Sequence, residues 1–316
     1  MQNCKITNLS TDIKYNLRNI NNFIFLNLNI IFFLLKKEEL KMKIEEFEDI
    51  LYEKEENGIC TITFNRPKRR NALTSVTFLE VWTALDDMEK DKNARVLIMT
   101  GSKEGRAFSS GGYFNMKMMT EIPKHILDEI DLLDIAQKRA CMKLWNFPKP
   151  IIAAINGLAI GAGITMPLAG ADLIYMTEDP EAYLRFNFAE RAIMPEFGLS
   201  FILPLYVGFQ KAAEICYFTE KIGPQEALKL GLVNNILPPD DLLPYAREQA
   251  LKLIPPKAAS MSISRIKQTM RVYFADIISD TLDLENEGLR ALMKTSDFRA
   301  STKSLITKKP PIYKGR

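Results

Sequence analysis

The sequence is poor in the residue types from which metal sites and disulfide frameworks are built. Among 316 residues there is one histidine, His125, and the four cysteines are far apart and form no CxxC pair. One histidine does not supply a metal site, and scattered cysteines are typical of free thiols in a reducing compartment. We therefore expect no metal centre and a cytoplasmic location. The cysteines are Cys4, Cys60, Cys141 and Cys216.

The sequence also lacks a strong excess of charge of either sign. The net charge is +3, and residues 1–41 hold six basic and three acidic side chains. Subtracting these from the 42 basic and 39 acidic residues of the whole chain leaves 36 of each from position 42 onward. Nucleic-acid binding through phosphate contacts needs a basic surface. We therefore expect no nucleic-acid partner.

Residues 1–41 contain no glycine, proline or alanine. The apolar stretch over residues 20–35 is interrupted by four asparagines and is shorter than a membrane span of about 20 residues, and no small-residue cleavage site follows it. The codons for residues 36–39 are purine-rich and can contain a ribosome-binding sequence ahead of Met42. We predict that residues 1–41 are a non-native or disordered leader, that Met42 is the start, and that the protein has no membrane partner.

From Met42 onward, short apolar strands alternate with helical segments. Strands are predicted over residues 59–64, 94–100, 151–155 and 172–176, where β-branched and apolar residues dominate. Helices are predicted from Thr74, over residues 124–144 and over residues 163–170. Strands separated by helices indicate parallel βαβ units with right-handed crossovers, so the fold class is α/β. Beyond Gly198 the pattern becomes helical, with helices predicted over residues 209–218, 223–230, 239–253 and 257–293.

Two glycine-rich loops follow predicted strands. The first reads Ala-Phe-Ser-Ser-Gly-Gly-Tyr over residues 107–113, and the second reads Asn-Gly-Leu-Ala-Ile-Gly-Ala-Gly over residues 156–163 and opens a helix. Small residues allow close backbone approach, and the start of a helix presents unpaired N–H groups at its positive end. Such loops either bind a developing oxyanion or are tight turns built for packing. Neither reads GxGxxG with a following acid, which disfavours a dinucleotide fold.

In combination with other motifs, these loops resemble those of the enoyl-CoA hydratase/isomerase (crotonase) superfamily. The similarity covers residues 47–298 and includes Asn-Arg-Pro at 65–67, Asn-Ala-Leu at 71–73, both glycine-rich loops, Asp172, and Gly-Leu-Val-Asn at 231–234. It implies a ββα spiral core over residues 42–240 and a C-terminal helical region over 241–316, assembled as a homotrimer or homohexamer. It further implies an acyl-CoA substrate, no separate cofactor, and an oxyanion hole formed by the N–H groups of Gly112 and Ala162.

The resemblance also assigns residues around the substrate. Tyr113 departs from the family, since hydratases commonly carry aspartate there, and it is expected to alter the mouth of the pocket only. His125 is expected to be an ordinary helix residue. The residues expected to bind substrate are Arg66, Lys68, Arg70, Ala107, Ser109, Ser110, Gly111, Tyr113, Gly161 and Thr165.

The acidic residues decide which reaction is expected. Hydratases of the family use two glutamates, and Thr165 occupies the place of the first, where it cannot act as a base. Glu190 is matched to the second, and Glu196 lies in a Pro-acid-x-Gly sequence that carries the proton-shuttling acid in isomerase-like members. Because a single carboxylate suffices to move a proton through an enolate, double-bond isomerisation is favoured.

Several alternatives remain open. Glu190 and Glu196 could act together in an enoyl-CoA or dienoyl-CoA hydratase, and Glu196 could be the nucleophile of a thioester hydrolase or dehalogenase. Each glutamate could also be a surface residue, Glu190 because it lies beside Arg191 and Glu196 because it lies in a turn. A non-enzymatic RNA-binding homologue is disfavoured by the neutral body of the chain.

Overall fold

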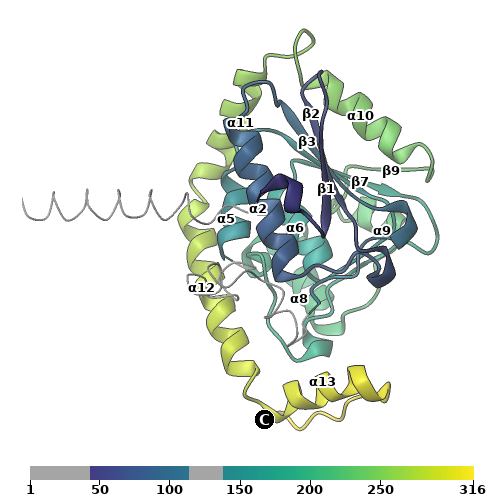
Figure 1. Ribbon diagram of the computed structural model, residues 1–316. Helices are drawn as coiled ribbons and strands as arrows, with labels where there is room; N and C mark the ends of the chain where they lie inside the picture. The colour runs from purple at the N-terminus through teal and green to yellow at the C-terminus, as the bar shows by residue number, and fades with distance from the viewer. Residues whose placement is uncertain (1–42, 114–137) are drawn as a thin grey trace, which may run out of the picture. The chain divides into compact units, whose positions relative to one another are not determined.

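The computed structural model describes residues 43–113 and 138–316, and two sheets organise them (Figure 1). The larger sheet has six strands in the order β1-β2-β3-β5-β7-β9. Its first two strands pair antiparallel and all other neighbours pair parallel. The strands are β1 (Ile50–Lys54), β2 (Ile59–Phe64), β3 (Val96–Gly101), β5 (Ile151–Ile155), β7 (Leu173–Thr177) and β9 (Asn235–Leu237).

A smaller parallel sheet repeats the order of the large one. It consists of β4 (Ala107–Ser109), β6 (Leu158–Ile160) and β8 (Leu184–Arg185), which follow β3, β5 and β7 in the chain. Each of these pairs of consecutive strands therefore adds one strand to each sheet, which is the ββα spiral that the family resemblance implies. The second glycine-rich segment is consequently not only a loop. Its residues Leu158–Ile160 form strand β6, because they pair with β4 and β8.

The helix predicted from Thr74 is confirmed as α2 (Ser75–Lys90). The Thr74 hydroxyl accepts from the Thr77 N–H at 3.1 Å, and the Thr77 hydroxyl accepts from the Thr74 N–H at 2.8 Å. Helix α2 packs on α5 (Ala140–Asn146), which packs on α6 (Ala162–Gly170). Most of the helix predicted over residues 124–144, including His125, lies outside the described residues.

The C-terminal half is helical, as predicted, but residues 257–293 form two helices instead of one. The interruption lies at Tyr273 and Phe274; α11 packs on α5, and α12 packs on both α5 and α7. No helix within 43–113 and 138–316 is long and apolar enough to cross a bilayer. The helices are α7 (Leu199–Val207), α8 (Phe209–Phe218), α9 (Pro224–Lys229), α10 (Leu242–Lys252), α11 (Ser260–Val272), α12 (Ala275–Leu292) and α13 (Ser296–Thr307).

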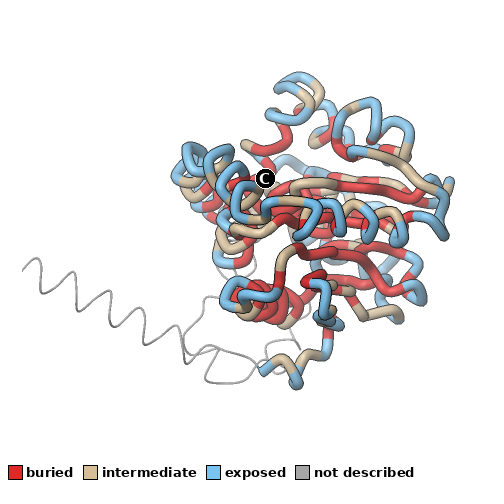
Figure 2. Tube along the Cα trace, turned by 90° about the horizontal axis from the view of Figure 1, so that it is seen from above, coloured by how far each residue is buried: buried red, intermediate tan, exposed pale blue. Residues whose placement is uncertain are grey.

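Helix α10 covers the large sheet with one apolar face. Its buried residues Leu242, Ala246 and Ala250 recur at helical spacing and pack against Ile98 and Ile152 of the central strands. Figure 2 shows the buried strands as red segments beneath helices whose outer faces are exposed. The burial of both faces explains why the central strands read as continuous apolar runs in the sequence.

The motif residue Asp172 anchors helix α11 to the core. Its carboxylate accepts from the backbone N–H of Ile151 and pairs with Lys267 at 2.8 Å and Arg271 at 3.2 Å. Lys267 is 3% exposed and also donates to the carbonyl of Lys149 at 2.9 Å. Burial lowers the pKa of Lys267 to about 8. Asp172 therefore has a structural role, and the contacts described above do not involve the glycine-rich loops.

Candidate active site

The two glycine-rich segments meet where strands β4 and β6 end. These strands are parallel neighbours, so their carboxyl ends lie at the same edge of the small sheet. A Cβ atom added to Gly111 would lie 2.5 Å from the Ile160 carbonyl oxygen and 3.8 Å from the Ala162 nitrogen. One added to Gly163 would lie 2.6 Å from the Ser109 carbonyl oxygen. Because only glycine permits such contacts, the two segments are in direct backbone contact.

At this junction the N–H groups of Gly112 and Ala162 have no hydrogen-bond acceptor in the described part of the chain. Gly112 lies in a parallel bridge with Leu73, in which Leu73 donates to the Gly111 carbonyl and Tyr113 donates to the Leu73 carbonyl. The bridge fixes the backbone on both sides of Gly112 and does not use its N–H. Ala162 is the first residue of α6, where an N–H group has no partner within the helix. This arrangement supplies two donors and the positive end of a helix dipole.

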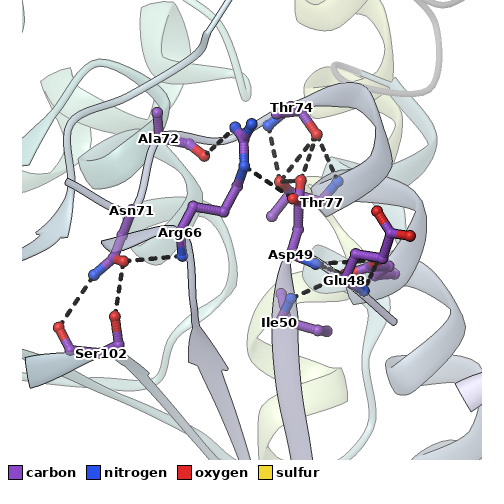
Figure 3. A network of polar contacts seen from close by, with 10 residues as sticks. Glu48, Asp49, Ile50, Arg66, Asn71, Ala72, Thr74, Thr77 and Ser102 are labelled. Atoms are coloured by element: carbon purple, nitrogen blue, oxygen red, sulfur yellow. Dashed lines mark hydrogen bonds and ion pairs between the residues drawn. The ribbon is translucent and has the colours of Figure 1, made fainter. Parts of the chain in front are cut away.

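A buried polar network holds the segment that supports the first loop (Figure 3). The Arg66 guanidinium pairs with Asp49 at 2.9 Å and donates to the Ala72 carbonyl at 3.0 Å. The Asn71 side chain accepts from the Arg66 N–H and donates to the Ala107 carbonyl at 2.7 Å. The network thus connects the segment before Leu73 to strand β4. Arg66, which the family resemblance assigns to substrate binding, has its guanidinium committed to this support.

The carboxylate of Glu80 belongs to the same network. It is fully buried and accepts from the backbone N–H groups of Glu48, Asp49 and Ile50 at 2.7–3.3 Å. Burial raises the pKa of Glu80 to about 7, with the nearby Asp49 carboxylate as a smaller cause, while the three N–H groups oppose the rise. One feature of the sequence indicates this buried role. Glu80 is an acid on the same face of α2 as the buried residues Thr77, Val81 and Ala84.

Glu196 lies beside the turn that precedes Ala162. Its Oε1 atom is 4.0 Å from the position that a Cβ atom on Gly161 would occupy. The other two atoms nearest to that Cβ position are Asn187 Oδ1 and a ring carbon of Phe188. The side chain is half-buried. The structure therefore brings Glu196 to the same backbone turn as one of the two candidate donors. Asn187 and Phe188 are neighbours that the sequence did not single out.

Glu190 is placed differently. Its carboxylate pairs with Arg185 and accepts from the Thr219 hydroxyl at 3.3 Å, and its side chain is 37% exposed. Arg185 also donates to the Thr219 carbonyl at 2.8 Å, so Glu190 takes part in a local polar cluster. At the Gly161 turn the residues of this segment that lie nearest are Asn187 and Phe188. Among the described residues Glu190 makes no hydrogen bond or ion pair with either loop, although the carbonyl of its partner Arg185 accepts from the Gly161 N–H at 2.9 Å.

Thr165 lies one turn into α6, and its N–H donates to the Gly161 carbonyl at 3.0 Å. The residue is 1% exposed, yet its hydroxyl has no hydrogen-bond partner among the described residues. Buried hydroxyls are nearly always paired, and a threonine within a helix commonly bonds the carbonyl four residues earlier. The helical direction of side chains points Thr165 back toward Gly161 and Ala162. Its unused hydroxyl is thus on the turn that Glu196 borders.

The remaining residues assigned to substrate binding mostly shape the first loop. The Ser109 hydroxyl accepts from the Gly111 N–H at 3.1 Å, and the Ser110 hydroxyl donates to the Arg69 carbonyl at 3.0 Å. Ala107 is buried within β4. Lys68 and Arg70 are exposed, which leaves their charges accessible to an anionic ligand.

The aromatic ring of Tyr113 lies beside two basic side chains of this part of the site. The guanidinium groups of Arg66 and Arg69 lie 5.6 and 5.4 Å from its ring centroid. Such cation–π contacts hold a ring in place beside basic groups. In residues 43–113 and 138–316, no group of histidine, cysteine and acidic side chains is arranged to hold a metal ion.

The chain is similar to known proteins over most of its length. The family model described as "Enoyl-CoA hydratase/isomerase" matches residues 54–316. The "Short-chain-enoyl-CoA hydratase" of Clostridium acetobutylicum is 28% identical over 266 residues, which cover 84% of this chain and 97% of that protein. The "1,2-epoxyphenylacetyl-CoA isomerase" of Escherichia coli is 24% identical over 262 residues, covering 83% and 97%.

Solved structures show the same fold. An enoyl-CoA hydratase/isomerase from Pseudoalteromonas atlantica T6c superposes with a TM-score of 0.73 at 22% identity, covering 84% of this chain and 100% of that one. The family model spans most of the chain, and the solved structure of a member of that family has the same fold. The protein therefore belongs to the enoyl-CoA hydratase/isomerase family of the crotonase superfamily.

Proposed function

We propose that this enzyme isomerises the double bond of an enoyl-CoA thioester, with Glu196 as its acid–base. The thioester oxygen accepts from the N–H groups of Gly112 and Ala162, and these donors stabilise the negative charge of an enolate. Glu196 removes a proton from C2 of a 3-enoyl-CoA, and the electron pair spreads into the thioester carbonyl and the C3–C4 double bond. The same carboxyl returns the proton to C4, leaving the double bond between C2 and C3.

One observation carries the choice of isomerase. Glu196 is the carboxylate beside the Gly161 turn, whereas Thr165 stands where a second acid would be needed and Glu190 is paired with Arg185. A proton can be moved from C2 to C4 by one carboxylate, while addition of water is favoured by two groups that orient and activate it. The reaction transfers only a proton, so it requires no cofactor beyond the CoA of the substrate.

A second candidate is hydration of a 2-enoyl-CoA, which the names of several relatives favour. In that case Glu190 would have to leave Arg185 and act with Glu196. The test is a pair of rate measurements on the purified protein, conversion of a 3-enoyl-CoA to the 2-enoyl-CoA and hydration of crotonyl-CoA. The proposal expects the first to be fast and the second slow, and the reverse order would favour the hydratase.

We further propose that copies of the chain associate as a homotrimer or homohexamer. Large apolar side chains are exposed on two helical surfaces, with Phe209 82% and Tyr217 73% exposed on α8 and with Met261 83% exposed on α11. Apolar patches of this kind mark surfaces that another protein covers. Light scattering coupled to size-exclusion chromatography tests the proposal, and a monomer at micromolar concentration would contradict it.

A further inference from the structure

The turn that carries Glu196 has an unusual backbone. Phe197 and Gly198 follow Glu196 with φ angles of 60° and 70°, so two consecutive residues adopt the left-handed conformation. A bulky residue with positive φ is an outlier that persists only when its surroundings hold it. Phe197 is fully buried, and its ring centroid lies 5.5 Å from that of Phe78. The turn therefore directs Phe197 into the core and leaves Glu196 half-buried beside Gly161.

A carboxylate from the C-terminal helical region holds this turn. Glu285 of α12 is 1% exposed, and its two oxygens accept from the Gly198 N–H at 2.9 Å and the Ser200 N–H at 2.8 Å. Gly198 is the N-cap of α7 and offers no side chain to bond the first N–H groups of that helix. Glu285 supplies the missing cap from 87 residues away in sequence, and its charge is favourable at a helix N-terminus.

The same face of α12 contacts the turn on the other side of Glu196. Gly288 lies three residues after Glu285, so the two share a face of the helix. A Cβ atom added to Gly288 would lie 2.7 Å from Cγ of Met194, two residues before Glu196. Helix α12 thus touches the turn through Met194 before Glu196 and through Gly198 and Ser200 after it.

Packing alone does not explain an acid at position 285. Ile278 and Leu282 are fully buried on α12, and residue 285 continues their spacing of i, i+4 and i+7. A leucine would complete this stripe without the cost of burying a carboxylate. A leucine, however, could not accept hydrogen bonds from the backbone N–H groups of Gly198 and Ser200.

We propose that Glu285 is a positioning residue, which, with Gly288 against Met194, fixes the turn so that the Glu196 carboxyl lies at the oxyanion site. The inference rests on the proposed role of Glu196 in proton transfer. It also links the C-terminal helical region to the chemistry of the core through one helix. A misplacement of about 1 Å in an acid–base group is sufficient to lower a rate by up to about 100-fold.

The test compares the full-length variants Glu285→Leu, Glu285→Gln and Gly288→Ala in the isomerisation of a 3-enoyl-CoA. We expect kcat to fall by about tenfold to 100-fold in Glu285→Leu and by a smaller factor in Glu285→Gln, which keeps one acceptor. KM should change less than twofold, because the loops that carry Gly112 and Ala162 are intact. Glu287→Gln is the matched control, since Glu287 is an exposed acid on the same helix.

A rescue experiment separates positioning from general loss of stability. In Gly288→Ala the added methyl group pushes Met194, and kcat should fall by several-fold. Adding Met194→Ala makes room for the methyl group and should restore kcat. The melting temperature and CoA affinity of each variant establish that the protein is folded. If Glu285→Leu fails to fold, the kcat values of Glu285→Gln, Gly288→Ala and the Gly288→Ala/Met194→Ala double variant test the positioning role.

The possible failures are distinguishable. Wild-type kcat in folded Glu285→Gln and Gly288→Ala, together with an inactive Glu196→Gln, would overturn the positioning role and leave the proposed function in place. A wild-type enzyme without isomerase activity, or a Glu196→Gln variant as fast as the wild type, would overturn the proposed function and this inference with it. A selective loss of kcat with rescue by Met194→Ala supports the inference.

Discussion

The Oε1 atom of Glu196 lies 4.0 Å from the position of a Cβ atom on Gly161, the residue that precedes Ala162 at the start of α6. This relationship places the proposed acid–base group and a proposed backbone donor on one turn. Residues far apart in the chain produce it, because strand β6 leads into the Gly161 turn and α12 holds the turn that follows Glu196.

Replacement of Ala162 by proline tests the backbone donor. Position 162 is the first of α6, where proline is well tolerated, so Ala162→Pro removes the N–H with little expected effect on the helix. We expect kcat to fall about 100-fold or more, which is the usual effect of losing an oxyanion donor. Ala162→Gly is the control and should remain active, since it keeps the N–H. Near-normal turnover by a folded Ala162→Pro protein would rule out this placement of the site.

Replacement of Thr165 by valine tests the unpaired hydroxyl. Removing a buried hydroxyl without a partner relieves a desolvation cost, so the unfolding free energy should stay constant or rise by up to about 1 kcal/mol. If the hydroxyl contacts substrate, kcat/KM should still fall several-fold, and Thr165→Ser should retain most of it. A loss of stability above about 1 kcal/mol with unchanged turnover would instead indicate a structural partner.

The pH dependence of stability tests the buried carboxyl of Glu80. Because burial raises the pKa of Glu80 from 4.5 to about 7 in the folded protein, the folded state binds the proton more tightly than the unfolded chain. The stabilisation from this group is therefore present below pH 4.5 and is lost as the pH rises through 7, by on the order of 3 kcal/mol.

Glu80→Gln has no titrating group at this position and provides the comparison. Urea unfolding of both proteins at pH 5 and pH 8 should show the stability advantage of the wild type shrinking at the higher pH. Measuring the difference between the two proteins cancels the titration of groups they share. A constant difference would mean that the three backbone N–H groups keep the pKa of Glu80 near its ordinary value.

Replacement of Lys267 by methionine tests the anchor at Asp172. The ammonium group is 3% exposed and is bound to Asp172 and to the Lys149 carbonyl, so its loss leaves a carboxylate short of a partner. We expect Lys267→Met to lower the unfolding free energy by about 3 kcal/mol, as for other broken buried pairs. Lys252→Met, which breaks an exposed pair with Glu248, should cost about 1 kcal/mol or less. Equal losses in the two variants would show that the anchor is unimportant.

Local signals predicted much of the fold from the sequence. The strands at 59–64 and 151–155 and the helix at 209–218 have the predicted bounds, because apolar runs and glycine or proline boundaries define them. The short strands β4, β6 and β8 were not predicted, since two or three residues carry no periodic pattern and pair only through the tertiary fold. The split between α11 and α12 was missed for a similar reason, as no glycine or proline marks it.

The candidate site was predicted unevenly. Motif order indicated the two loops and Glu196, and the structure brings these together at the Gly161 turn. Glu190 was indicated by its position in the sequence, but its contact with Arg185 depends on side-chain direction, which motif order does not show. Glu285 was not singled out, although an acid on the apolar stripe of a helix is a readable signal of a buried cap.

The most direct test of the account is the isomerase activity of Glu196→Gln beside that of Glu190→Gln. Glutamine keeps the volume of the side chain but cannot accept the proton, so Glu196→Gln should lose about 100-fold or more in kcat for a 3-enoyl-CoA with little change in KM. Glu190→Gln should stay within a few-fold of the wild type. The account would be contradicted if the wild type hydrated crotonyl-CoA rapidly and lost that activity in both variants.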